Sequence, residues 1–367
     1  MARYFPQFWR QTRPFAKHLA ERLRQAARSG GLPAANQVLF EDIAASAQRA
    51  GRPLRSLLDN NLYGHEGLLG QSLAHWEAEG GEVLDFAPAL VEALRHSDCG
   101  EMQLADVLGT TERALYLHFG PQTDIVMGAG QPVEGLLVLH TPSAGYSRMM
   151  LMGRTDTGWL EGVGQSQMLR FRLADMARLP FDLAIDAAVA LDVQDIEDAR
   201  KKLHAQDPAG LLATSNSFDE AQESQRRNAR AYTQALQLAG NALAYVTAYP
   251  DDIQTQWQPG TSEALSAKAA KPGKEGFRAA SKLRSMGYRE VRVVGGEFER
   301  ADERARAGGP RSAHWRRGHW RNQAHGPQLS LRKLIWIQPM RVLGNNESAT
   351  LQAPPPVQGV AYRDQLH

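Results

Sequence analysis

One long helix, predicted between residues 217 and 249, constrains the fold more than any other feature of the sequence. It begins with a capping box, because the Ser217 hydroxyl and the Glu220 carboxylate are spaced to satisfy free backbone donors. It ends before Pro250, since proline has no amide donor and restricts the preceding residue. One apolar stripe runs along it: Tyr232, Leu236, Leu243 and Val246. Residues 223–230 are nearly all polar, so we expect the first half to project from the body or lie across a solvated face.

Short extended runs precede this helix and predict a mostly antiparallel sheet. Apolar residues alternate at 115–119 and 169–173 and form compact runs at 136–139 and 149–152, with Gly and Pro between them. Helical spacing predicts three earlier helices, at 15–27, 38–50 and 88–95. Beyond Pro250, the pattern predicts a helix at 277–286, a strand at 290–294 and two extended stretches around Gly326–Pro327, with 334–337 buried.

These elements predict an α+β fold in five parts. We expect a helical N-terminal part at 1–110, a sheet and the long capped helix at 111–249, and a linker or loop at 250–274, where Pro, Gly, Ser and Ala are frequent. A C-terminal α+β segment with a basic β-hairpin follows at 275–345, and a loose tail at 346–367. A length of 367 residues suits either two domains or one large body.

Composition excludes several classes of protein. A hydrophobic fraction of 43% supports a sizeable core, yet no apolar run approaches the roughly 18 residues of a membrane span. The N-terminal residues lack the apolar core of a signal peptide, so we expect a cytoplasmic protein with no membrane partner. The single cysteine, Cys99, excludes an internal disulfide and any multi-cysteine metal site, and it is expected to be an inert thiol.

No common catalytic or cofactor motif is present. The sequence lacks a Walker-type phosphate loop, a G-x-S-x-G elbow, H-E-x-x-H and G-x-G-x-x-G. We therefore predict no cofactor and no enzymatic activity, although a ribonuclease with a site assembled from distant residues stays an alternative.

Two clusters of potential metal ligands favour other roles. The acidic stretch Asp182, Asp186, Asp192, Asp195, Glu197 and Asp198 lacks calcium-loop spacing and is expected to be a solvated strand-to-helix connection. His314, His319 and His325 lie among arginines, which oppose cation binding. The sequence thus predicts no metal site.

The net charge of +2 conceals a basic C-terminal segment. Between Arg304 and Arg341 there are nine Lys and Arg residues and no Asp or Glu, whereas the rest of the chain carries 33 basic and 40 acidic residues. Residues 314–321 interleave these cations with Trp and His, which is a chemically reasonable RNA-binding surface. In an extended strand, however, alternate side chains face opposite ways, so the aromatic residues could equally belong to the core.

The basic segment also carries a family resemblance. Arg316-Arg317-Gly318-His319-Trp320, followed by a Gly and by Gln338-Pro339, resembles the C-terminal end of the type V-A anti-CRISPR family that lowers expression of the effector nuclease during translation. Weaker similarities are Pro250-Asp251-Asp252-Ile253, at the end of the long helix, and Trp76 with Asp85. The chain departs from the family in having Trp336-Ile337 before Gln338-Pro339.

The resemblance implies a non-enzymatic regulator from a mobile element, phage or plasmid. It would bind the nascent polypeptide of a type V-A CRISPR nuclease, with the ribosome or RNA as further partners, and cause loss of the nuclease mRNA. The matching residues imply a binding site at Arg316, Arg317, Gly318, His319, Trp320, Gln338 and Pro339, to which the adjacent Arg321 is added. An RNA-binding protein that uses the basic segment stays the second hypothesis, for which affinity should fall steeply with salt.

Overall fold

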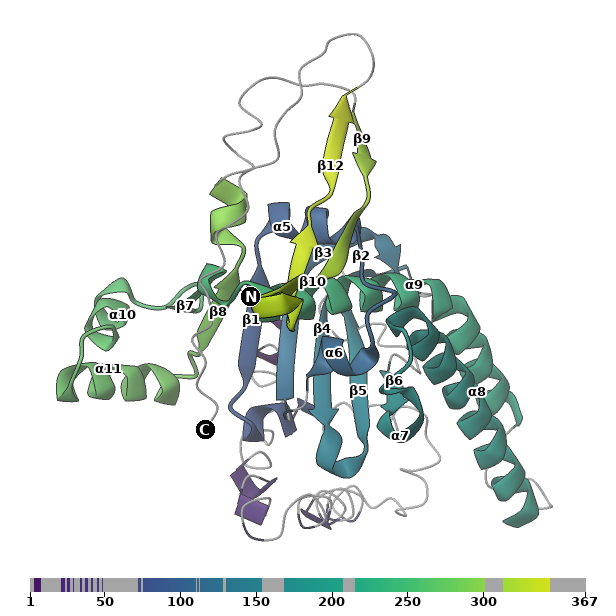
Figure 1. Cartoon of the computed structure of the whole chain (residues 1–367). Coiled ribbons are helices and arrows are strands. Elements are labelled where there is room, and N and C mark those ends of the chain that lie inside the picture. Colours follow the sequence, from purple (N-terminus) through teal and green to yellow (C-terminus); the bar gives the residue numbers. More distant parts are fainter. Residues whose placement is uncertain are drawn as a thin grey trace.

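The computed structural model describes residues 3–7, scattered positions between 21 and 48, and residues 72–73, 75–109, 111, 113–127, 130–153, 168–206, 215–300 and 313–343. Within these ranges the chain combines helices with a large, mostly antiparallel sheet (Figure 1). The predicted α+β class is confirmed. The division into five parts stays a prediction, and the helices predicted at 15–27 and 38–50 fall mostly outside the described residues.

A seven-stranded sheet forms the centre of the fold, in the order β6-β5-β4-β3-β1-β8-β7. Its strands are β1 (Glu82–Phe86), β3 (Arg113–Val126), β4 (Pro132–Thr141), β5 (Tyr146–Gly153), β6 (Met168–Arg172), β7 (Ile253–Trp257) and β8 (Glu290–Val294). Strands β3 to β6 form the antiparallel meander that the sequence predicts. β1 lies parallel to β3 on one side and to β8 on the other, and β7 runs antiparallel to β8.

Two hydrophobic layers cover the two faces of this sheet. On β4, Leu136 and Val138 belong to the layer that contains the helices, whereas Leu137 and Leu139 belong to the opposite layer. The opposite layer is completed by N-terminal residues: Tyr4, Phe5, Leu73 and Trp76. Because successive side chains alternate between two buried faces, the strand is a continuous apolar run in the sequence.

The helical layer contains α5 (Pro88–Arg95), α6 (Leu104–Leu108), α7 (Leu173–Met176), α8 (Phe181–Gln206) and α9 (Ser215–Ala248). Helix α9 confirms the long predicted helix, and Tyr232, Leu236 and Leu243 of its stripe are buried. Glu223 and Arg226 are exposed, and Figure 1 shows this end of α9 running beside α8 beyond the sheet. The side chains of the predicted capping box lie outside those described, so the box stays a prediction.

Three segments differ from the sequence prediction. Residues 250–274, predicted as a linker or loop, contain the 3-10 turn η2 (Pro250–Asp252), strand β7 and helix α10 (Glu263–Ala269). The acidic stretch 182–198 lies within α8 rather than in a strand-to-helix connection. The N-terminal part, predicted as helical, also contains β1 and β2 (Ser97–Asp98). In contrast, the predictions of α5, of α11 (Lys274–Ser285) and of β8 are confirmed.

The basic C-terminal segment forms a β-hairpin, as predicted. Its strands are β9 (Ala313–Arg316), β10 (Gly318–His325), β11 (Leu331–Ile337) and β12 (Met340–Leu343), with the turn η3 (Pro327–Leu329) between β10 and β11. A further 3-10 turn, η1 (Pro142–Ala144), joins β4 to β5. Of the stretch 334–337 that the sequence predicts as buried, Trp336 is buried, Leu334 and Ile335 are half-buried and Ile337 is exposed.

The buried side chain of Asn241 in α9 joins four parts of the chain. Its Nδ2 donates hydrogen bonds to the backbone oxygens of Leu94, Ser97 and Gln237, at 3.2, 3.1 and 3.0 Å. Its Oδ1 accepts one from Nε1 of Trp320 at 2.7 Å. The end of α5, β2, α9 and the hairpin therefore meet at one amide, which satisfies polar groups that burial would otherwise leave without partners.

Replacing Asn241 by alanine should therefore destabilise the whole protein. We expect Asn241→Ala to lower the free energy of unfolding by about 2–4 kcal/mol, because the Trp320 indole and two carbonyls lose buried partners. Arg230→Ala, at an exposed position of the same helix, is the matched control and should change it by less than about 0.5 kcal/mol. Urea denaturation checks both; equal effects of the two variants would contradict the role of Asn241.

Candidate functional site

The residues that carry the family resemblance lie at a bend in the C-terminal hairpin. β10 pairs with β11, and β9 pairs with β12, so Arg317 on one side and Gln338–Pro339 on the other interrupt one long antiparallel ladder. Gly318 packs directly on Pro339: a Cβ on Gly318 would lie 2.7 Å from the proline Cδ and nitrogen. The two halves of the motif thus contact each other across the hairpin, and the contact requires glycine.

The same bend attaches the hairpin to the body of the protein. The Gly318 amide donates to the backbone oxygen of His96 at 2.8 Å, and β10 continues in parallel pairing with β2. Arg317 forms an ion pair of 3.4 Å with Asp98. This attachment gives the motif a structural role beside any role in binding.

Trp320 of β10 and Trp336 of β11 point into the core. Their rings stack with centroids 6.0 Å apart and an interplanar angle of 17°. Trp320 donates to Asn241, as described above, and Trp336 Nε1 donates to the Ser97 hydroxyl at 2.9 Å. These indoles are therefore withdrawn from the surface on which they would stack with RNA bases.

The eight residues predicted as a binding site are thus divided between surface and interior. Arg316, Arg317, His319 and Arg321 are exposed, Trp320 and Gln338 are half-buried, and Gly318 and Pro339 are buried. Arg316, His319 and Trp320 do not line a common groove, because Trp320 faces inward and His319 outward. A binding role for the exposed members stays a prediction.

The second resemblance, at Pro250–Ile253, is a turn in which Asp252 is buried and Pro250 and Asp251 are exposed. Asp252 accepts a hydrogen bond from the Tyr245 hydroxyl at 2.7 Å and another from the Glu297 amide at 2.9 Å. The pKa of the Tyr245 hydroxyl is raised by burial, by the nearby charge of Asp252 and by the hydrogen bond between these two side chains. Tyr245 also contacts the edge of Trp336, with ring centroids 5.5 Å apart. The turn therefore fixes the end of α9 against the hairpin.

The third resemblance, Trp76 with Asp85, lies under the N-terminal residues. Trp76 Nε1 donates to the Glu82 carbonyl at 2.8 Å. Asp85 accepts from the Tyr4 hydroxyl at 2.8 Å and pairs with Arg3 at 2.9 Å. Burial raises the pKa of the Asp85 carboxyl, while the hydrogen bond from Tyr4 and the Arg3 charge act in the opposite direction. Asp85 thus anchors the N-terminal segment.

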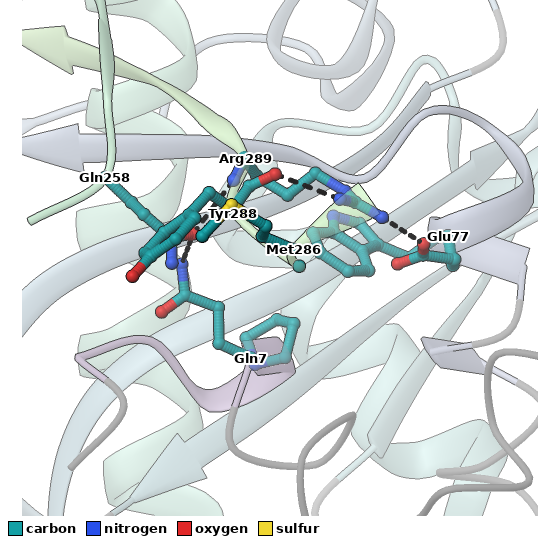
Figure 2. Close-up of a pocket in the computed structure, with 9 residues that line it drawn as sticks. Gln7, Glu77, Gln258, Met286, Tyr288 and Arg289 are labelled. Carbon is teal, nitrogen blue, oxygen red and sulfur yellow. Dashed lines mark hydrogen bonds and ion pairs between the residues drawn. The ribbon is translucent and has the colours of Figure 1, made fainter. Parts of the chain in front are cut away.

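A pocket of about 280 Å³ opens beside this segment (Figure 2). Its lining comes from four separate stretches of sequence: Pro6, Gln7, Trp76, Glu77, Gln258, Met286, Gly287, Tyr288 and Arg289. No sequence prediction joins these stretches. Of the nine residues, Trp76 alone was singled out from the sequence, and only for its resemblance.

Hydrogen bonds fix the polar wall of the pocket. Gln7 Nε2 donates to Oε1 of Gln258, which also accepts from the Arg289 amide at 3.1 Å. Arg289 and Glu77 form an ion pair of 2.9 Å, with side chains 19% and 15% exposed. The charges neutralise each other, so the wall offers aromatic, thioether and amide groups to a ligand without a strong net charge.

The other candidate chemistries receive little support from the described residues. No group of three His, Cys, Asp or Glu in these ranges is placed to hold a metal ion, and the His314 side chain is not among those described. Burial raises the pKa of the Cys99 thiol, which keeps it protonated and unreactive. Over the part of the chain that the structure describes, no helix is long and apolar enough to span a bilayer.

The contact between Gly318 and Pro339 predicts a local effect on the hairpin. Gly318→Ala should destabilise it by about 1–3 kcal/mol, since the added methyl group must displace backbone or proline atoms. Hydrogen exchange should become faster in β10 and β11, and little changed in β4 and β5. His319→Ala, at the exposed neighbour, is the control and should leave exchange unaltered; unaltered exchange in Gly318→Ala would refute the packing argument.

The raised pKa of Asp85 predicts a pH dependence. The folded protein holds this proton more tightly than the unfolded chain, so the contribution of the group to stability is present below the ordinary Asp pKa of about 4 and is lost as pH rises through the folded-state value. The free energy of unfolding of Asp85→Asn, minus that of the wild type, should therefore increase with pH over this window. Urea denaturation at several pH values measures this difference. A difference that does not change with pH would show that the pKa of the Asp85 carboxyl is not raised.

Comparison with known proteins places the chain in a described family. The family model AcrVA2-like, the anti-CRISPR type V subtype A2 family, matches residues 84–344, which extend from β1 to the end of the hairpin. The chain is also similar to a solved structure described as the crystal structure of AcrVA2, with 10% identity, coverage of 92% of this chain and 97% of that chain, and a TM-score of 0.43. No curated protein matches the sequence. The family assignment rests on the family model.

Proposed function

The chain belongs to the AcrVA2-like anti-CRISPR type V subtype A2 family, and on that premise we propose that it recognises the nascent polypeptide of a type V-A nuclease and promotes loss of the nuclease mRNA. The family supports an inhibitor of type V-A CRISPR systems. The observation that carries the proposal is the extent of the match, which includes the central sheet, α9 and the whole hairpin.

The pocket beside the N-terminal segment supports recognition of a peptide. At about 280 Å³ it has room for a few side chains of an extended chain. Met286 is 56% exposed at its rim, where it can adapt to an apolar side chain. Gln7 and Gln258 offer amides to a peptide backbone (Figure 2). We propose that this pocket holds the nascent chain.

The pocket also suggests how related proteins differ in their targets. Pro6, Gln7, Trp76 and Glu77 precede the family match, whereas Gln258 and residues 286–289 lie within it. One wall is thus built by residues that the family model does not include. We propose that this wall selects the target peptide.

We propose that a host ribonuclease, rather than this chain, degrades the message. Within the described ranges no cluster of metal ligands is assembled, and the buried Asp85 is not among the residues that line the pocket. The alternative of RNA binding through the hairpin loses two aromatic side chains for stacking, because Trp320 and Trp336 pack inward. An adaptor role fits these features better than nuclease chemistry.

A pull-down from a translation system tests the proposal. Ribosomes stalled while translating a type V-A nuclease should be recovered with the tagged protein through the nascent chain. Met286→Glu should reduce recovery by at least about tenfold, because it places a charge at the apolar rim. Phe277→Glu changes an even more exposed apolar residue, at 72%, which lies on α11 away from the pocket lining, and it should recover as much as the wild type.

Two outcomes would overturn the proposal. Failure of the wild type to recover the nascent chain, with nuclease mRNA unchanged, would remove nascent-chain recognition. Decay of purified nuclease mRNA by the purified protein alone would replace the adaptor with a ribonuclease.

A further inference from the structure

The hairpin β10–β11 has one face against the body and one face turned away from it. Trp320 and Trp336 are paired across the two strands and mark the inner face. Since side chains alternate along a strand, their neighbours in sequence face outward. The outward residues form four cross-strand pairs: His319 with Ile337, Arg321 with Ile335, Gln323 with Lys333, and His325 with Leu331.

This end of the molecule exposes unusually many apolar side chains. Of the eight large hydrophobic residues that are exposed in the described chain, four lie between residues 329 and 340. They are Leu329, Leu331, Ile337 and Met340, with exposed fractions of 63, 47, 38 and 41%. Such grouping is typical of an interaction surface, because scattered single residues would need no explanation.

The same surface is cationic and nearly free of counter-charges. Arg321 and Lys333 lie among the outward residues and are exposed, Arg316 and Arg332 are exposed beside them, and no Asp or Glu occurs between residues 304 and 341. Across the described residues, Arg317 is the one cation of the hairpin with an ion pair to a carboxylate, that of Asp98. Three arginines of the central sheet, by contrast, are paired with carboxylates: Arg170 with Asp195, Arg172 with Asp175, and Arg292 with Glu82. The hairpin therefore favours a partner that supplies carboxylates.

The edge of the hairpin offers backbone groups to such a partner. The small sheet has the order β11-β10-β2, so β11 is an edge strand, and in the described ranges β10 is its pairing partner. An edge strand presents amides and carbonyls with which another extended chain can pair. On β11 the Trp336 amide already donates to the Tyr249 hydroxyl at 3.3 Å, so the open part of the edge is residues 331–335. A strand added there would place alternate side chains beside the outward row of Leu331, Lys333, Ile335 and Ile337.

From these features we propose that the outward face and free edge of β10–β11 bind an extended polypeptide segment in which apolar and acidic side chains alternate. The apolar residues of the segment would contact Leu331, Ile335 and Ile337, and its carboxylates would pair with Arg321 and Lys333. A polypeptide is favoured over RNA because the outward row is aliphatic, the indoles of Trp320 and Trp336 face the body, and a strand edge complements another strand. The inference goes beyond the proposed function, because the hairpin is a second surface, separate from the pocket.

Binding of a designed peptide tests this inference without ribosome or nuclease. The probe is a fluorescently labelled ten-residue peptide of alternating valine and glutamate, titrated with the full-length protein by fluorescence anisotropy. Control probes are the alternating valine and lysine peptide, a valine and glutamate peptide of equal composition in two blocks, and a ten-nucleotide uridine RNA. The alternating valine and glutamate peptide should bind at least tenfold more tightly than each control, and more weakly as salt is raised.

Charge reversal distinguishes this surface from general attraction. The double variant Arg321→Glu with Lys333→Glu should lose at least tenfold in affinity for the valine and glutamate peptide and gain affinity for the valine and lysine peptide. Arg230→Glu with Arg278→Glu, at exposed positions on α9 and α11, is the matched control and should change neither affinity. Both double variants should retain the circular dichroism spectrum of the wild type, since all four residues are exposed.

Several results would overturn the inference. They are absence of binding, equal affinity for the alternating and block peptides, tighter binding of the uridine RNA, or self-association through the hairpin that the peptide does not compete away. None of these results bears on recovery of the nascent chain through the pocket, so the two proposals fail separately.

Discussion

The amide of Asn241 is the constraint on which the arrangement of this protein depends. It lies in the buried half of α9 and bonds the end of α5, β2 and the Trp320 indole at once. The hairpin, which is a separate small sheet, thereby has a fixed position on the helical layer. Burial makes this set of hydrogen bonds costly to break, because the polar groups would lose partners that replace water.

The family resemblance gains a physical explanation from these hydrogen bonds. Gly318 and Pro339 form the bend, the pair Trp320 and Trp336 occupies the interior, and Asp252 holds the end of α9 beside them. Residues that identify the family in the sequence are thus largely those that dock the hairpin. Of the exposed cations next to them, Arg317 takes part in this docking through Asp98, whereas Arg316 and Arg321 remain available for a partner.

The spacing of apolar residues in the sequence predicted those helices and strands that bury one face or both faces. The apolar stripe of α9, the runs of β4 and β5, and the hairpin were all predicted in place. β7 was missed because it lies at the edge of the sheet and its sequence, IQTQW, is mostly exposed. The surface helix α10 buries no residue and so carries no stripe. The pocket was invisible because tertiary folding alone brings Gln7, Glu77, Gln258 and Arg289 together.

The central proposal is that this AcrVA2-like protein acts on the nuclease polypeptide rather than on its RNA. The most direct measurement compares decay of two nuclease messages in cells that produce the protein, one intact and one frameshifted by a single inserted nucleotide directly after the start codon. The two RNAs are nearly identical, but their polypeptides differ throughout. Because the pocket would read side chains of the nascent chain, the intact message should decay faster in the presence of the protein and the frameshifted message should not. Equal acceleration of both would contradict the account.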